Sequence, residues 1–476
     1  MRGKSRNSKI HHLREKCKQR RKQCERLKKR NKELSQSRDS WCAKAKERNK
    51  EIWRLRKKLD RLALKQVKAA DPDRVKRHSY GVKQIELALL MLQLAGLSYR
   101  ACCKILKVIN LMYNLQMKVP SYSTIRYWEH KLGYYRLAYQ DSQDHSQWAL
   151  LIDESVSIGQ EKLLLLLGVN LAHYSFDRAL CFEDVRVLDM AIGKSWKAEQ
   201  IATRIEQVQS KGYDIAYAVG DQGHNIVKAL KIRALNQVKD CTHLFSLYLE
   251  KAYKTHEDFK AFCQACTQMR RKGILSQYAA LLPPAQRAKA RFLNLSPLIN
   301  WGCKCLDLLQ NKNHCSELSP LIEHLEWIEN YREILVELKA ILEDLQGMQK
   351  MIKTAGFNCG TFIQCLQLIG QSSMSPGFKQ GLIDYLNDIR TMHPQRANVL
   401  CCSDIIESYF GKYKLKAGQR ISQQCLQIPN YARKQNSKEV KLALEQVRVV
   451  DLNNWVEKQL GQSTRKLRMK LFKKIA

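Results

Sequence analysis

The chain has 476 residues, with 83 Lys and Arg against 45 Asp and Glu, a formal charge of +38 at pH 7. This excess predicts a polyanionic partner, and the length suggests about three domains. No apolar run approaches the ~20 residues of a membrane helix, and no apolar segment follows the basic start, so we expect neither a membrane protein nor a secreted one.

Residues 1–70 are the most basic part of the chain, with 27 Lys and Arg against 7 Asp and Glu. Apolar residues there recur at alternating four- and three-residue spacing, which predicts a coiled coil that pairs with another copy, and Asn31 would fix its register. Arg20 and Arg48 interrupt the pattern, so a solvated basic arm is the alternative. Either form would contact phosphates without reading bases. The spaced positions are Leu13, Cys17, Cys24, Leu27, Asn31, Leu34, Trp41, Ala45, Ile52, Leu55, Leu59 and Leu62.

Residues 71–140 predict a small helical domain. Two apolar-faced helices meet at a turn containing Gly96, with Ser98 as the cap of the second, which is a helix-turn-helix pattern. A third helix, capped by Ser121 or Ser123, carries donors suited to phosphates and base edges. The alternative is a helical connector without DNA contacts. The donors are Ser123, Thr124, Arg126, Tyr127, His130 and Lys131.

Residues 141–243 predict a five-stranded mixed sheet. Three apolar runs close together in sequence would form an antiparallel meander. A helix over about 196–210 separates them from a fourth run that ends at Asp221. A right-handed crossover would place this run parallel to the first, which ends at Asp153. A second helix, over about 224–236, leads to a fifth strand near 238–242.

This topology would bring Asp153 and Asp221 to the same carboxyl edge of the sheet, where open α/β sheets bind ligands. Two carboxylates about 4 Å apart repel by roughly 4 kcal/mol at an effective dielectric near 20. A bridging Mg²⁺ or Mn²⁺ would remove that penalty. Glu154 would point to the opposite side of the strand, whereas Asp184 and Asp189 are competing ligands near the third strand.

Residues 244–400 show no strand alternation and predict an all-helical segment with a basic first half. Trp301 is a candidate for stacking on an unpaired base, with packing in the core as the alternative. Three groups suggest zinc but fit no standard finger: Cys263 with Cys266, Cys303 with Cys305, and His314 with Cys315. The 17 cysteines of the chain are otherwise expected to be reduced thiols. The basic residues are Lys260, Arg270, Arg271, Lys272, Arg287, Lys289 and Arg291.

The order and spacing of these segments, over roughly 148–414, resemble the DDE transposases of bacterial insertion sequences, which have an RNase H-like catalytic core. In that family one Asp ends the first strand, a second ends the fourth, and a Glu lies on a later helix. The matching residues are Asp153, Asp221 and Glu407. Several cut-and-paste families, hAT-like ones among them, also carry a C/D-x-x-H string, here Asp240 to His243, and a large helical insertion before the last helix.

The resemblance implies that Glu407 lies on a final catalytic helix over about 403–414. Asp404, one turn earlier on a similar face, is the alternative third ligand. Lys414 stands where some bacterial transposases hold a terminal phosphate, although Ser403 replaces the Arg that accompanies it there. His243 would donate to a scissile phosphate, or else pack as a core histidine.

The resemblance therefore implies a magnesium- or manganese-dependent transposase that uses two ions on DNA and acts as a homodimer or higher homo-oligomer associated with the bacterial nucleoid in the cytoplasm. The rivals are a DNA-binding regulator with a silent core and an RNase H-like nuclease acting on RNA or junction DNA. The expected division is a coiled-coil arm (1–70), a helix-turn-helix domain (71–140), the first part of the core (141–243), a helical insertion (244–400), the last core helix (401–420) and a basic helical tail (421–476).

Overall fold

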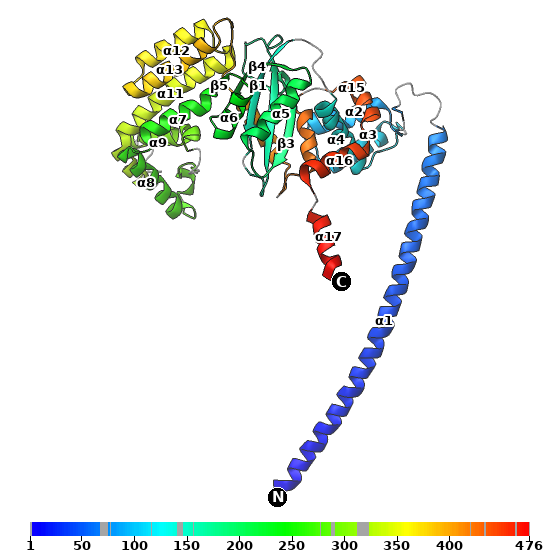
Figure 1. Cartoon of the computed structure of the whole chain (residues 1–476). Helices are drawn as coiled ribbons and strands as arrows, with labels where there is room; N and C mark the ends of the chain where they lie inside the picture. Colours follow the sequence, from blue (N-terminus) through cyan, green and yellow to red (C-terminus); the bar gives the residue numbers. More distant parts are fainter. Residues whose placement is uncertain are drawn as a thin grey trace. The chain divides into compact units, whose positions relative to one another are not determined.

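A computed structural model describes residues 2–66, 75–76, 78–115, 117–139, 146–155, 157–276, 278–286, 291–311, 323–418, 420–432, 435–461 and 464–475. The chain divides into two compact units, 1–74 and 75–476 (Figure 1). Within the described residues, no helix is both long enough and apolar enough to cross a membrane.

The first unit is one continuous helix, α1 (Arg2–Gln66). The absence of proline and the single early Gly3 allow this length. Its large apolar side chains, such as Leu27, Leu34 and Leu59, are exposed on the single chain. Such residues are the ones that the predicted coiled coil would bury against a second copy, and the coiled coil remains a prediction.

The second unit is built around a five-stranded sheet in the order β3-β2-β1-β4-β5. β2 is antiparallel to both β1 and β3, whereas β4 is parallel to β1 and β5. This arrangement confirms the predicted mixed sheet. The strands are β1 (Gln147–Glu154), β2 (Lys162–Asn170), β3 (Val185–Gly193), β4 (Asp214–Gly220) and β5 (Gln237–Lys239).

The strands alternate their side chains between two apolar layers. Leu150 and Ile152 of β1 face a cluster that includes the buried sides of α5 (Ala198–Ser210) and α6 (His224–Ile232) (Figure 1). Leu151, in contrast, belongs to the large cluster on the other face, which continues into the helical segment. Burial on both faces explains why these strands read as continuous apolar runs.

The described part of 241–398 forms helices and no strand. The longer helices are α7 (Cys241–Tyr253), α8 (Glu257–Gly273), α9 (Ser296–Gln310), α11 (Arg332–Ala355), α12 (Cys359–Gln371) and α13 (Pro376–Met392), and the 3-10 turns are Ala279–Leu281, Phe292–Asn294 and Glu323–Tyr331. An isolated bridge outside the sheet pairs Phe357 with Val399, and α14 (Asp404–Lys414) begins shortly after it.

A separate helical cluster contains α2 (Val82–Leu94), α3 (Tyr99–Met112) and α4 (Tyr122–Ala138). The predicted caps are present: the side chain of Ser98 accepts from the Ala101 amide, and that of Ser121 accepts from Thr124, each at 3.2 Å.

The C-terminal segment completes this cluster. α15 (Ser437–Gln446) contributes Val440 and Leu444 to its core, and α16 (Val449–Leu460) contacts α4. The segment predicted as a basic helical tail over 421–476 thus contains the helices α15 and α16, which pack against the cluster of α2–α4. The last helix, α17 (Thr464–Ile475), still carries the basic residues of that segment.

A 3-10 segment, η7 (Gln423–Asn430), packs tightly against α4. A Cβ placed on Gly133 of α4 would stand 1.6 Å from the backbone oxygen of Leu426. One turn along α4, Arg136 pairs with Glu439 of α15 at 2.6 Å in a mostly buried contact. The C-terminal part of the chain is thus held against α4 by both close packing and charge.

We predict that Gly133→Ala will lower the free energy of unfolding by about 3 kcal/mol, because the backbone of η7 must move to admit the methyl group. Gly370→Ala is the control: this glycine lies in α12 with nothing within 4 Å of the added carbon. It should be neutral or stabilise by up to about 1 kcal/mol. Equal effects in urea unfolding would contradict the close contact.

Candidate functional site

Two carboxylates meet at one edge of the sheet. Ile152 of β1 pairs in parallel with Gly220 of β4, so Asp153, near the end of β1, and Asp221, which follows β4, lie at the same edge of the sheet. A Cβ on Gly220 would lie 2.8 Å from the Ile152 oxygen, which explains why a glycine stands there. Asp221 is oriented by a 2.9 Å hydrogen bond from the Gly223 amide to its Oδ1.

The charge of Asp153 is held in an unfavourable setting. Burial, together with the carboxylates of Asp221, Glu407 and Glu154, raises the pKa of Asp153 to about 8. The Glu154 amide, which donates to Asp153 Oδ1 at 2.7 Å, acts in the opposite direction. Glu407 is therefore near enough to repel Asp153, although almost the whole helical segment separates them in sequence.

α14 brings Glu407 to this edge. The helix contacts β1, and its buried apolar side chains include Ile406, Tyr409 and Phe410. Glu407 lies on its exposed face, whereas Asp153 and Asp221 are half-buried. The site is consequently open to a large substrate rather than enclosed.

Asp404, the alternative third ligand, is engaged elsewhere. Its Oδ2 lies 2.5 Å from Nζ of Lys353 on α11. This pairing leaves Glu407 as the carboxylate of α14 that acts on Asp153.

A buried carboxylate fixes the start of α14. Asp240 is 1% exposed and caps α7, since its Oδ1 accepts from the His243 amide at 3.0 Å. Its Oδ2 accepts from the amide of Ser403 at 2.5 Å and from the hydroxyl at 2.7 Å. The Cys241 amide also donates to the Cys401 oxygen at 2.8 Å. The end of the sheet and the start of α14 are thus tied together.

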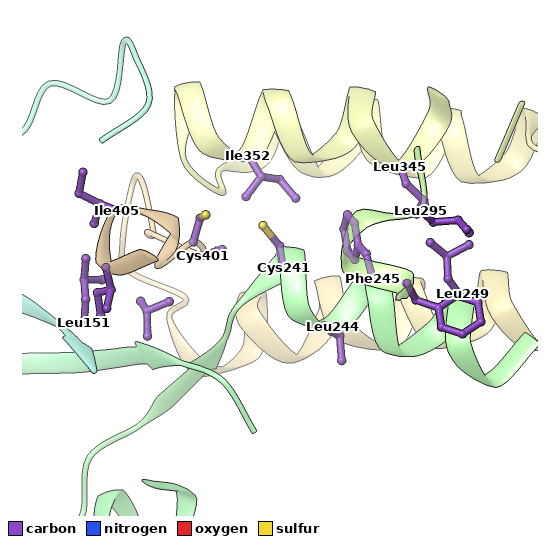
Figure 2. Close-up of a cluster of buried hydrophobic side chains, with 14 of the residues drawn as sticks. Leu151, Cys241, Leu244, Phe245, Leu249, Leu295, Leu345, Ile352, Cys401 and Ile405 are labelled. Carbon is purple, nitrogen blue, oxygen red and sulfur yellow. The ribbon is translucent and has the colours of Figure 1, made fainter. Parts of the chain in front are cut away.

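Apolar packing surrounds this tie. Figure 2 shows Cys241 and Cys401 facing one another below Ile352, with Ile405 close to Leu151 of β1. Because α11, α7, β1 and α14 all contribute to this one cluster, α14 cannot shift without opening it. The sequence predicted a strand up to 242, but β5 ends at Lys239 and the string from Asp240 to His243 begins a helix instead.

Among the described residues, the His, Cys, Asp and Glu group whose ligand atoms all lie within 4.8 Å of one another is Asp240, Cys241 and Cys402. Both oxygens of Asp240 are already hydrogen-bonded, and a hydrogen bond with Cys241 together with burial raises the pKa of Cys402 well above its ordinary range. Neutral thiols are poor metal ligands, so this group is better explained as the tie that holds α14.

The carboxylate oxygens of Asp153, Asp221 and Glu407 do not all lie within 4.8 Å of one another. A site for two ions does not require the ligand atoms to be so close, because the two ions of such a site are about 3.5 to 4 Å apart and the outer carboxylates bind on opposite sides. The donor set consists of carboxylate oxygens, which fit Mg²⁺ or Mn²⁺. Asp153, Asp221 and Glu407 are the residues that would hold such ions.

The other acids near the sheet have partners. Glu154 is 2.8 Å from Nζ of Lys162 on the neighbouring strand, as expected for a residue outside the site. Asp184 accepts from Arg178 at 2.6 Å, and Asp189 lies 3.4 Å from Arg204.

The zinc groups expected in the helical segment find no support among the described residues, since none of Cys263, Cys266, Cys303 or Cys305 belongs to a ligand group. His314 and Cys315 lie outside the described residues.

The predicted DNA contacts on α4 need correction. His130 and Lys131 are buried, and Nζ of Lys131 donates to the Leu444 oxygen of α15 at 3.3 Å. No exposed ammonium remains there for a phosphate, so Lys131 leaves the set of DNA contacts. Ser123, Thr124, Arg126 and Tyr127 are partly exposed and stay in it.

α3 is a further basic helix of this cluster, which the predictions from the sequence did not include. Arg100, Lys104 and Lys107 recur along one side of α3 and are exposed. Their spacing of four and three residues is a signal visible in the sequence. The prediction had placed the DNA contacts on the capped third helix, α4, instead.

The side chain of Trp301 packs against other residues of the helical segment and does not project into solvent. Its Nε1 donates to the Leu281 oxygen at 3.0 Å, and its ring lies near Trp327. Core packing, the alternative to base stacking, describes it better. Arg271, Lys272 and Lys414 are exposed, whereas Arg270 is partly buried.

No family model and no curated protein matches the chain. Among solved structures, it is similar to the Drosophila P element transposase strand transfer complex, with 14% identity and a TM-score of 0.41 over 77% of this chain and 94% of that one. At that level of similarity the functional argument has to come from the chain's own residues.

We predict that the apo protein loses stability as pH rises from 3.8 towards 8, because the folded state keeps the Asp153 proton that the unfolded chain releases. Asp153→Asn should therefore be more stable than the parent by about 5 kcal/mol at pH 8 and equal to it below pH 4. Urea unfolding across this range measures both. Parallel pH profiles of the two proteins would contradict the raised pKa. Asp307→Asn, at an exposed position of α9 that does not contribute to the pKa of Asp153, is the control that should keep the parent profile.

Removing the tie should loosen α14. Asp240→Ala leaves three buried donors without an acceptor and should lower the free energy of unfolding by about 3 kcal/mol, whereas Ser403→Ala, which removes one hydroxyl, should lower it by about 1 kcal/mol. Asp307→Ala, on the exposed side of α9, should stay within about 0.5 kcal/mol of the parent. Equal stabilities of all three variants would show that Asp240 holds nothing.

Proposed function

We propose that this protein is a DDE transposase that performs metal-dependent DNA strand cleavage and strand transfer at the ends of a mobile element. The observation that carries the proposal is the convergence of Asp153, Asp221 and Glu407 from two strands and a distant helix. The sheet with α14 would be an RNase H-like core, and 244–400 its helical insertion.

The clustering itself is an argument for a bound cation. Burial and the nearby carboxylates of Asp221 and Glu407 raise the pKa of Asp153, so its ionised form is unfavourable at this edge. A protein that only binds DNA gains nothing from this arrangement, whereas a divalent ion would turn the repulsion into attraction. This favours an enzyme over a DNA-binding regulator with a silent core.

Bound at this edge, two ions would activate water or a strand 3′-hydroxyl and stabilise the leaving oxygen. The chain's own contribution is to position the carboxylates. β1 and β4 present Asp153 and Asp221, while the Asp240 tie sets the start of the helix that carries Glu407. The exposure of Glu407 leaves room for a duplex, and no nucleophilic side chain is needed for the reaction.

DNA would be held by the positive charge of the chain. In this proposal α1 pairs with a second copy as a coiled coil, and α2–α4 act as a helix-turn-helix domain in which α3 presents Arg100, Lys104 and Lys107 to the DNA. Exposed Lys414 would meet a phosphate beside the acids. His243, half-exposed in the first turn of α7, stays a proposed donor to the scissile phosphate.

An RNase H-like nuclease acting on RNA–DNA hybrids or junctions would use the same acids. Substrate choice separates it from a transposase, since a transposase should cut duplex DNA carrying the ends of its element and join the product to a target. The test therefore offers matched end-containing duplex, junction DNA and hybrid in Mg²⁺.

Asp153→Ala, Asp221→Ala and Glu407→Ala should each lower the cleavage rate at least about a hundredfold while DNA affinity stays within about threefold, since each variant removes a metal ligand but no cation. Asp404→Ala is the matched control on the same helix and should keep activity, because its partner is Lys353. If Glu407→Ala cut normally and Asp404→Ala did not, the third ligand would be misassigned. Full activity in Asp153→Ala would end the proposal.

A further inference from the structure

A cavity of about 240 Å³ lies in the helical segment, apart from the three acids. It is formed by the second half of α8, the loop 284–286, Arg291 and the start of α9. Three of its lining residues are arginines, and none is acidic. The lining comprises Cys263, Cys266, Thr267, Arg270, Arg271, Pro284, Ala285, Gln286, Arg291 and Leu298.

The positive charge in this cavity is not neutralised by the described part of the protein. No ion pair with a described residue is formed by Arg270, Arg271 or Arg291. Arg270 is held at the rim by a hydrogen bond from its Nη1 to the Pro283 oxygen. The Nε of Arg291 is buried and has no hydrogen-bond partner among the described residues.

The cysteines of the cavity do not supply the missing negative charge. Burial raises the pKa of Cys263 and of Cys266, so both remain neutral thiols at physiological pH. They also fail to form a metal-ligand group with any described residue. Among the described residues no carboxylate offsets the three guanidinium groups that line this cavity, so it presents positive charge to an anion from solution.

From this geometry we infer that the cavity is a binding site for a phosphate group, held by Arg270, Arg271 and Arg291. The planar guanidinium group binds phosphate oxygens through two parallel hydrogen bonds, which suits it to this anion better than lysine. Thr267 and Gln286 add neutral donors.

The volume limits what the cavity can enclose. At about 240 Å³ it is smaller than the 300 to 1,000 Å³ typical of sites that enclose a drug-sized ligand. It suits a phosphate or diphosphate group, with the rest of the molecule outside. The group has two sources, a phosphate of a DNA strand or a small phosphorylated molecule, and the site does not depend on the proposed catalysis.

The test uses the full chain in 0.2 M salt, where unspecific attraction to a protein of charge +38 is screened. Calorimetry measures binding of inorganic pyrophosphate to the parent and to the double variant Arg271→Gln/Arg291→Gln. Lys304→Gln is the charge control, an exposed lysine on α9 outside the cavity. A competition arm asks whether pyrophosphate displaces a fluorescent 5′-phosphorylated duplex.

We expect the double variant to bind pyrophosphate at least tenfold more weakly than the parent, and Lys304→Gln to bind within twofold. Displacement of the duplex, together with weaker duplex binding by the double variant, would identify the occupant as a DNA phosphate. Unchanged duplex binding would identify it as a small phosphorylated molecule. A parent that does not bind pyrophosphate, or a folded double variant that binds it as well as the parent, would overturn the site.

Discussion

The structure depends on holding like charges together. Asp153 and Asp221 leave adjacent parallel strands, and Glu407 approaches them from α14, so three carboxylates share one sheet edge. Nothing in folding rewards this, since each added carboxylate raises the pKa of Asp153. The surrounding protein has to impose the arrangement, and most of the second unit can be understood as the means by which it does so.

Two kinds of interaction impose it. The parallel pairing of β1 with β4 places Asp153 and Asp221 at the same level along the two strands. The absence of a side chain on Gly220 lets its backbone approach Ile152 closely enough for that pairing. The helical segment then has to bring α14 back to the same edge. Asp240 does this through its bonds to Ser403, and the apolar cluster around Cys241, Ile352 and Ile405 fills the space behind it (Figure 2). The repulsion between the carboxylates is thus offset by the packing of the apolar cluster and by the hydrogen bonds of Asp240.

Much of the sheet could be predicted because its signals are local. Apolar runs bounded by Gly, Asn and Asp mark the strands, and the helix between the third and fourth strands implies the parallel crossover. The caps at Ser98 and Ser121 were predictable for the same reason. The position of Glu407 was not, because no local pattern states where a helix returns after about 160 residues, and only a family resemblance suggested it.

Long-range packing also explains the errors. The sequence around Lys131 predicts an exposed donor, but α15, which lies more than 300 positions later in the chain, covers this side chain. Trp301 is covered in the same way by residues of its own helical segment. Asp240 looked like part of a catalytic string, yet its partner Ser403 is visible only in three dimensions. Burial by distant segments leaves no periodic trace in the buried residue's own neighbourhood.

The account rests on the three acids acting as one cation site. The most direct measurement is anomalous X-ray scattering from crystals of the parent protein grown with Mn²⁺ at pH 8. Two peaks about 3.5 to 4 Å apart, bounded by Asp153, Asp221 and Glu407, are the predicted result. Manganese bound elsewhere, or an empty edge with Glu407 turned away from the two aspartates, would contradict the account.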